Sequence, residues 1–528
     1  MAAPDTGPQT LVSKALCHAD SEAPRRPQIL PGYGSGGFAV QTAIPDAQAF
    51  FDNGMQLAHA FAHKAAIGAF EESARLDPGC ALCLWGEAWA SGPTINYPIE
   101  PGDNARLADM ASRAAKLARN GSEKERLLID ALVARYARGG GEWGNRAFAE
   151  AMDALARRWA ADDELQVLAA DAWMTLDSNR NRFDHTEREI ALLEAVLARN
   201  PDYTPAIHFY IHATEIAGEP ARAESYANRL PELAPKASHL IHMPSHTYYH
   251  VGRYQDAVDA NVRAVAIGRE NARRLGLPEP DGVWDLPYHA HNVQFGVGAA
   301  LISGDAKDAL ALSDPLVARV AAGKARDGSA FPQMVAGTAY FAEARFAGPK
   351  TVLALPAPPD KYGWAMAYWH YARGEAAAQV GDAAAVRREA AAIVVPAVSA
   401  KADDGESAVL AAASRMARIS RLVLEGRAAM LEKKPNVALG AFRKASRLQE
   451  AESFQQFADP PAFWYPVRRD VAVALLALGR AKDALAEAEA TLALMPKEPE
   501  TERIRTRARA ALGETVAIAG ESSSRRLR

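Results

Sequence analysis

Alanine-rich stretches recur along the chain with the polarity pattern of a helix, a short turn and a second helix, and strand-like alternation is nearly absent. Positions in these stretches repeat at a fixed interval. Gly218 and Gly252 are 34 residues apart, and so are Ala223 and Ala257. A repeat of this length corresponds to one helical hairpin, which buries its apolar face against its neighbours. The sequence therefore predicts an all-α, curved solenoid of stacked helical hairpins.

The spacing inside one unit is that of a tetratricopeptide repeat. In the segment 50–78, Gly54, Ala66 and Phe70 precede the closing Pro78 at the intervals of that motif. The same pattern returns in five later units, which contain Trp173, Leu193 and Pro201; Gly218, Ala223 and Pro235; Gly252, Tyr254 and Ala257; Gly426, Pro435, Ala438, Phe442 and Ala445; and Gly479, Ala484 and Pro496. The fold class is thus a tetratricopeptide-like solenoid.

The period is interrupted once, and composition changes at both ends. Residues 271–288 contain Pro, Gly and Trp and predict an inserted loop. We expect four parts: an irregular, Pro/Gly-rich N-terminal segment at 1–40, a solenoid that carries a histidine-rich site at 41–330, C-terminal repeats at 331–515, and a polar tail at 516–528.

Histidines are concentrated in neighbouring units and keep the repeat period. His208 and His212 recur 34 residues later as His242 and His246. In tetratricopeptide repeats the first helix of each hairpin lines the concave surface, at the second, fifth, ninth, twelfth and thirteenth positions of the unit. These inward positions fall on His208, His212 and Glu215 in one unit, on His239, His242, His246, Tyr249 and His250 in the next, and on His291 after the loop.

Imidazoles placed in this way could share metal ions. Side chains four residues apart lie on one helix face, and packed helix axes are about 8–10 Å apart. Because metal–nitrogen bonds are about 2.0–2.1 Å long, the two pairs could converge on one ion or flank two. We expect metal ligands among these histidines, with Glu215 and Tyr249 as the catalytic candidates.

The ligand types narrow the choice of metal. Imidazoles suit copper, zinc, iron or nickel, whereas calcium and magnesium need oxygen ligands. Carboxylates are scarce, which argues against a carboxylate-bridged di-iron site. The segment HFYIH places Phe209 where a zinc protease would have its general-base Glu.

Three alternatives remain for the metal. They are a copper centre, mononuclear or binuclear with about three imidazoles per ion; a mononuclear iron held by His208, His212 and Glu215; and a zinc hydrolase with three histidines and Glu215 as base. We favour copper.

Composition excludes several classes of function. The 528 residues are 49% apolar and 23% charged with a net charge of −4, and Lys and Arg are dispersed. We therefore expect no nucleic-acid partner. No apolar run is long enough for a membrane span, and the chain as given begins without the pattern of a signal peptide.

Three cysteines are too few for a disulfide framework. Cys80 and Cys83 could form a redox or metal pair, but no second CxxC motif completes a thiolate site. We expect them to be small buried helix residues.

The blocks 63–98, 208–215 (HFYIHATE), 237–254 (ASHLIHMPSHTYYHVGRY) and 289–292 resemble a widespread, largely uncharacterised group of bacterial tetratricopeptide-repeat proteins with HxxxHxxE and HMPSH motifs. The resemblance implies a shared site that includes His63, His208, His212, Glu215, His242, His246 and His291. It also implies a periplasmic or secreted setting. It supplies no activity.

Two classes of function compete. In the first, the chain is a metal-dependent enzyme, a copper oxidase or oxygenase that acts on a small organic substrate, aromatic or otherwise, in a pocket closed by the loop at 271–288. In the second, the groove binds a peptide or protein partner, or carries copper. Peptide-binding grooves would be expected to present Lys, Arg and Asn at inward positions, whereas this one presents imidazoles and tyrosines. We therefore favour the enzyme.

Overall fold

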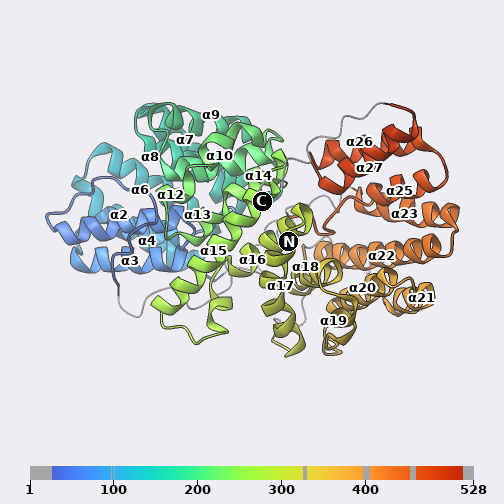
Figure 1. Cartoon of the computed structure of the whole chain (residues 1–528). Helices are drawn as coiled ribbons and strands as arrows, with labels where there is room; N and C mark the ends of the chain where they lie inside the picture. Colours follow the sequence, from blue (N-terminus) through green and yellow to red (C-terminus); the bar gives the residue numbers. More distant parts are fainter. Residues whose placement is uncertain are drawn as a thin grey trace, which may run out of the picture.

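The computed structural model describes residues 27–96, 98–99, 102–324, 330–395, 405–451 and 460–514. Within these ranges the regular elements are helices and there is no β-strand, so the predicted all-α solenoid is confirmed. Figure 1 shows the two ends of the chain as separate helical arrays, joined at the centre by α15 to α18. The expected polar tail at 516–528 and residues 1–26 lie outside the described residues.

The first array follows an irregular segment at 27–44. Its helices are α2 (Pro45–His59), α3 (His63–Leu76), α4 (Ala81–Ala90), α5 (Asn104–Leu117), α6 (Glu123–Tyr136), α7 (Gly141–Arg158), α8 (Asp163–Arg180), α9 (Thr186–Arg199), α10 (Thr204–Ile216), α11 (Glu224–Ala227) and α12 (Leu230–Leu233). The short 3-10 helix η3 (Pro220–Ala223) and α11 and α12 stand where a regular repeat would have one continuous second helix.

The centre and the second array complete the chain. The helices are α13 (Ser238–His242), α14 (Pro244–Val251), α15 (Tyr254–Arg274), α16 (His289–Ser303), α17 (Ala306–Ala321), α18 (Ala330–Phe346), α19 (Pro349–Ala354), α20 (Gly363–Gln379), α21 (Ala383–Ala392), α22 (Gly405–Leu431), α23 (Pro435–Gln449), α25 (Arg468–Ala477), α26 (Ala481–Leu494) and α27 (Pro499–Ala511). The inserted loop occupies 275–288, because α15 continues through Arg274.

Small residues allow the hairpins to pack closely. The Phe70 ring of α3 is fully buried and lies against Gly54 of α2 and Gly86 of α4. A Cβ at Gly54 would come within 2.7 Å of the ring, closer than van der Waals contact permits. The repeat motif therefore requires glycine there because the aromatic ring fills the space of a side chain.

The helix that carries His242 and His246 is interrupted at Met243 and Pro244. Proline has no N–H, so Pro244 cannot donate to the carbonyl one turn earlier. Met243 nevertheless keeps helical angles, with φ −49° and ψ −38°. His242 and His246 therefore remain one turn apart on the same side, with ring centroids separated by 4.9 Å.

The end of the second array contacts the centre of the chain. The Tyr254 hydroxyl donates to the carbonyl of Pro496 at 2.9 Å, and the Lys497 ammonium donates to the carbonyl of Val251 at 3.1 Å. The turn before α27 thus packs on the turn between α14 and α15. Both arrays therefore border the hairpin formed by α14 and α15 (Figure 1).

Our expectation for Cys80 and Cys83 was wrong in one respect. Both are buried, but they form a disulfide with an S–S distance of 2.03 Å instead of two separate thiols. Cys80 is the N-cap of α4, and the first turn of the helix brings Cys83 beside it. The Ser73 hydroxyl contacts the Cys83 sulfur at 3.0 Å.

In the part of the chain that the structure covers, no helix combines the length and the apolar character needed to cross a membrane.

Candidate metal centre

Six imidazoles form two groups of three at the junction of α10, α13, α14 and α16. The first group is His208, His212 and His239, and the second is His242, His246 and His291. Within each group the candidate ligand nitrogens lie within 4.8 Å of one another. No carboxylate or cysteine belongs to either group.

The two groups are neighbours. The ring centroids of His212 and His246 are 5.4 Å apart, and those of His239 and His242 are 5.7 Å apart. The two pairs, which are 34 residues apart in the sequence, therefore meet in space. The third histidine of each group comes from a different repeat unit than the pair it joins. His239 joins the pair on α10, whereas His291 from α16 joins the pair on α13 and α14.

Three of the imidazoles have their tautomer fixed by an acceptor on the outer side of the ring. The Nδ1 atom of His208 donates to the carbonyl of His59 at 2.7 Å. The Nδ1 atom of His246 faces the Glu215 carboxylate at 3.1 Å. Because carbonyl and carboxylate oxygens only accept, each Nδ1 carries the proton and each Nε2 keeps a lone pair.

The third acceptor is an asparagine on α15. The Nδ1 atom of His242 lies 2.7 Å from Oδ1 of Asn261, whose Nδ2 donates to the carbonyl of Ala257 at 2.8 Å. This second bond fixes the orientation of the amide, so its oxygen faces the ring. His242 must therefore donate through Nδ1 and keep the lone pair on Nε2.

Two of these outer bonds, at His242 and His246, direct lone pairs at one another. The Nε2 atoms of His242 and His246 are 3.1 Å apart, although neither carries a proton when the rings are neutral. Nε2 of His291 lies 3.1 Å from the same atom of His242. In the first group, Nε2 of His208 lies 3.2 Å from Nε2 of His239. A cation between the Nε2 atoms of His242 and His246 would replace their repulsion with coordination.

Five of the six imidazoles are held in the neutral form that binds metals. Burial, with a contribution from the neighbouring histidines, lowers the pKa of His212 and of His291 to about 3. Burial likewise places the pKa values of His208, His239 and His242 well below the ordinary value. Unprotonated imidazoles are therefore present at neutral pH without competition from protons.

Aromatic rings enclose the first group. The Phe61 ring is 4.4 Å from His208 and 5.0 Å from His239, and the Tyr288 ring is 4.2 Å from His239. Both aromatic residues have left-handed backbone angles, with φ 58° for Phe61 and 63° for Tyr288. Non-glycine residues adopt this conformation at a cost, and such strain is concentrated at functional sites.

A small cavity lies beside this group. It has a volume of about 40 Å³, which is enough for a water molecule, and its walls include Phe61, His239, Tyr288 and His289. In the described part of the chain, the buried Nδ1 atoms of His239 and His289 have no hydrogen-bond partner. Burial lowers the pKa of His289 to about 3, and the charges of Arg269 and Arg319 act in the same direction.

The other sequence candidates lie outside the two groups. His63 begins α3 and stacks on Phe61 at 5.4 Å. The His250 side chain is 45% exposed and lies 3.2 Å from the Glu215 carboxylate. The Tyr249 hydroxyl donates to the carbonyl of Phe295 at 2.8 Å. Glu215 contacts His246 and His250 and belongs to neither group.

The carboxylate of Glu215 remains ionised in this setting. Burial alone would raise the pKa of Glu215, but the electrostatic interaction with His246 and the hydrogen bonds from His246 and His250 outweigh it and hold the pKa well below its ordinary value. A carboxylate that accepts Nδ1–H from a metal-binding histidine is a common means of orienting the ring.

Sequence reasoning missed three residues that shape the site: Phe61, Asn261 and Phe295. Asn261 could have been found because it is an amide on the apolar side of α15, where buried polar side chains need a partner. His59 itself pairs through Nε2 with Glu164 at 2.5 Å, and its ring is not directed at either group.

No model of a known protein family matches this chain, and no curated protein matches its sequence. Solved structures with some likeness include the yeast Tom70 protein, at 11% identity over 89% of this chain and 90% of that one, with a TM-score of 0.28. The human IFIT1 dimer with m7Gppp-AAAA has 12% identity over 90% and 92%, with a TM-score of 0.32. The APC/C hetero-tetramer Cut9-Hcn1 has 12% identity over 88% and 76%, with a TM-score of 0.30.

Proposed function

We propose that this protein is a copper-dependent oxidase or oxygenase with a binuclear centre, in which His208, His212 and His239 hold one ion and His242, His246 and His291 hold the other. The observation that carries this proposal is the pair of adjacent three-imidazole groups, together with the opposed Nε2 lone pairs of His242 and His246. Three neutral nitrogens around one point satisfy a transition metal and leave room for a further ligand.

The donor set favours copper over the alternatives. A site made of imidazoles alone has the affinity order in which copper(II) exceeds zinc and iron(II). The mononuclear iron alternative needs Glu215 beside His208 and His212, but the carboxylate is hydrogen-bonded to His246 and His250. The zinc alternative keeps three histidines and a free position, so metal analysis must separate it from copper.

Copper at both groups would supply one-electron redox chemistry and a place for dioxygen to bind. The protein residues orient and seal the site. Asn261, Glu215 and the carbonyl of His59 hold three rings in position, while Phe61 and Phe295 exclude water. Glu215 also links His246 to the exposed His250, which gives protons a route to solvent.

We propose that the substrate is a small organic molecule with an aromatic or other apolar body, since the rings of Phe61 and Tyr288 flank the first group. We also propose that residues 41–330 form the array that carries the metal site and that residues 331–515 form the C-terminal repeats. Membership in the bacterial group with HxxxHxxE and HMPSH motifs is part of the same proposal, as are supporting roles near the site for His63 and Tyr249.

Elemental analysis of purified protein reconstituted with copper tests the proposal. We expect about two ions per chain. The double variant His208→Ala/His212→Ala should lose about one ion, and His242→Ala/His246→Ala should lose the other, because each change removes two of three ligands. His370→Ala is the matched control, since His370 pairs with Glu389 far along the chain and should leave metal content unchanged.

Electron paramagnetic resonance then separates one ion from two, because two coupled copper(II) ions suppress the signal that a single ion gives. Wild-type protein should give a weak signal, and each double variant should give a strong one. A colourless protein with stoichiometric zinc would replace this proposal with the hydrolase. Protein without bound metal after reconstitution would leave the groove as a binding surface for a peptide or protein partner.

A further inference from the structure

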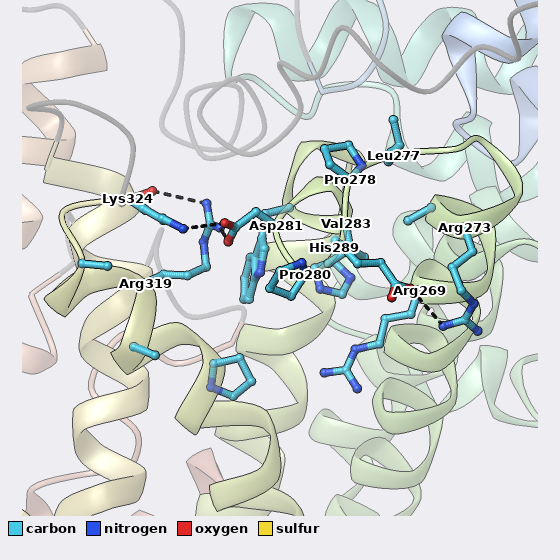
Figure 2. A pocket seen from close by; sticks show the side chains of 16 residues that line it. Arg269, Arg273, Leu277, Pro278, Pro280, Asp281, Val283, His289, Arg319 and Lys324 are labelled. Carbon is cyan, nitrogen blue, oxygen red and sulfur yellow. Dashed lines mark hydrogen bonds and ion pairs between the residues drawn. The ribbon is translucent and has the colours of Figure 1, made fainter.

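A separate cavity lies under the inserted loop. It has a volume of about 570 Å³ and is bordered by the end of α15, the loop residues 277–284, the start of α16, and α17 (Figure 2). This volume lies within the range of small-molecule sites, which is about 300–1,000 Å³. Trp284 and three prolines, Pro278, Pro280 and Pro315, supply much of its apolar wall.

The charged side chains of the cavity are mostly positive. Arg269, Arg273, Arg319 and Lys324 line it together with only two acids, Glu279 and Asp281. The chain as a whole has a net charge of −4, so this local excess of positive charge is opposite to the overall balance. A recessed, positive and partly apolar cavity favours an anionic ligand.

Two of the cations share one carboxylate, and the other two are available for a ligand. Asp281 accepts from Arg319 at 2.5 Å and from Lys324 at 2.6 Å, as Figure 2 shows. Arg273 and Glu279 are 3.7 Å apart and both exposed, so their attraction is weak. Among the described residues, Arg269 has no hydrogen-bond or ion-pair partner.

The base of the cavity is formed by a buried histidine without a partner. His289 is 2% exposed, and its Nδ1 atom makes no hydrogen bond within the described chain. Its ring meets Trp284 edge to face at 4.9 Å. His291, two residues later, faces His242 at 4.7 Å instead. The first turn of α16 therefore separates this cavity from the metal groups.

We propose that this cavity is a second binding site, for a small organic anion with a flat apolar body. The body lies against Trp284 and the prolines, and a carboxylate or phosphate group binds Arg269 and Arg273. The proposal is independent of the metal, because none of the six grouped histidines lines this cavity.

Isothermal titration calorimetry with the full chain tests this site, with benzoate, phenyl phosphate, inorganic phosphate and benzyl alcohol as probes. An aromatic anion should bind more tightly than neutral benzyl alcohol by about tenfold or more, since each charge-assisted hydrogen bond contributes on that order. The stronger of benzoate and phenyl phosphate identifies the anionic group. Inorganic phosphate should bind more weakly than phenyl phosphate because it lacks the apolar body.

Two variants locate the binding. Arg269→Gln/Arg273→Gln should weaken the aromatic anion by about tenfold or more. Ala318→Trp should abolish binding by filling the cavity from the exposed side of α17, without disturbing the core. Arg263→Gln is the matched control for the two arginines, because Arg263 is also on α15 but pairs with Glu232 outside the cavity.

Each titration is repeated after treatment with a chelator. Binding of the probe that disappears after this treatment is assigned to the metal groups. Retained binding in the chelated wild type supports the cavity site whether or not the metal proposal holds. The inference is overturned if benzoate and phenyl phosphate do not bind below about 10 mM. Equal binding of benzyl alcohol, or unchanged binding in both cavity variants, overturns it as well.

Discussion

The amide of Asn261 accepts the Nδ1 proton of His242 at 2.7 Å, and its own Nδ2 is anchored on the carbonyl of Ala257 at 2.8 Å. The Asn261 side chain on α15 thereby fixes the direction of the Nε2 lone pair of His242 on α13. Asn261 is fully buried, so no water molecule can take over its role without a rearrangement. The proposed metal centre thus depends on a residue that binds no metal.

Asn261→Ala should weaken copper binding by about 10–100-fold, because the His242 ring loses the acceptor that fixes its tautomer and orientation. The measurement is a competition titration of the copper-loaded protein with a chelator of known affinity. Asn261→Asp keeps an acceptor at the same place and should restore most of the affinity.

Asn53→Ala is the control for the loss of a buried amide, since Asn53 bonds the backbone of Leu30 away from the centre. This variant should lose stability but keep its affinity for copper. Equal affinity in Asn261→Ala and wild type would show that Asn261 does not orient His242.

Repeat spacing was sufficient to bring four imidazoles to one place. His208, His212, His242 and His246 follow from two facts of the sequence, the interval of four residues on a helix and the interval of 34 between units. Both intervals describe regular backbone, which sequence patterns determine well.

The grouping of the imidazoles required packing that spacing does not describe. His239 lies beside His208 because α13 and α14 pack against α10. The acceptors for the Nδ1 protons of His208, His242 and His246 come from three separate elements. His250 keeps the repeat register, but it lies in the last turn of α14, where its side chain is 45% exposed and contacts Glu215. The cysteines show the same limit, since only the first turn of α4 reveals that Cys80 and Cys83 can bond.

Removal of copper should lower the thermal unfolding temperature. A metal that binds only the folded protein at a hundredfold excess over its Kd stabilises it by about 2.7 kcal/mol, which corresponds to a shift on the order of 5 °C. Differential scanning calorimetry with and without chelator measures the shift. The variant His242→Ala/His246→Ala should respond less than wild type, and readdition of copper should restore the original transition. A chelator shift of the same size in a variant that lacks both histidine pairs would contradict a stabilising metal at these groups.

Gly252→Ala should weaken the contact between the centre of the chain and the C-terminal repeats. Gly252 has φ 74°, and a Cβ there would overlap the carbonyl oxygen of Pro496. Gly218→Ala is a matched control, because Gly218 has φ 72° and nothing within 4 Å of its Cβ position. Both changes carry the same backbone cost of about 1–2 kcal/mol, so any additional destabilisation of Gly252→Ala measures the contact.

Limited proteolysis locates the effect of that change. Gly252→Ala should expose the turn before α27 to cleavage earlier than wild type or Gly218→Ala. If both variants unfold at the same temperature and are cleaved at the same rate, the contact contributes nothing to stability.

Glu189 should make the protein less stable as the pH rises. The residue is 1% exposed, and in the described chain neither carboxyl oxygen has a hydrogen-bond partner. Burial, with a contribution from Asp177, raises the pKa of Glu189 from 4.5 to about 9. The folded chain therefore retains a proton that the unfolded chain releases, so the contribution of Glu189 to stability is fully present below pH 4.5 and is lost as the pH rises to about 9.

Glu189→Gln removes this proton uptake and keeps the size of the side chain. Between pH 6 and pH 8.5 the free energy of unfolding of the wild type should fall by up to about 1.4 kcal/mol per pH unit more than that of the variant. Hydrogen exchange of the α9 amides at increasing urea concentration measures this difference. Glu187→Gln is the control, because Glu187 is exposed on the same helix and should leave the pH dependence unchanged. Parallel pH profiles for wild type and Glu189→Gln would mean that Glu189 is ionised in the folded chain and has found a partner for its charge.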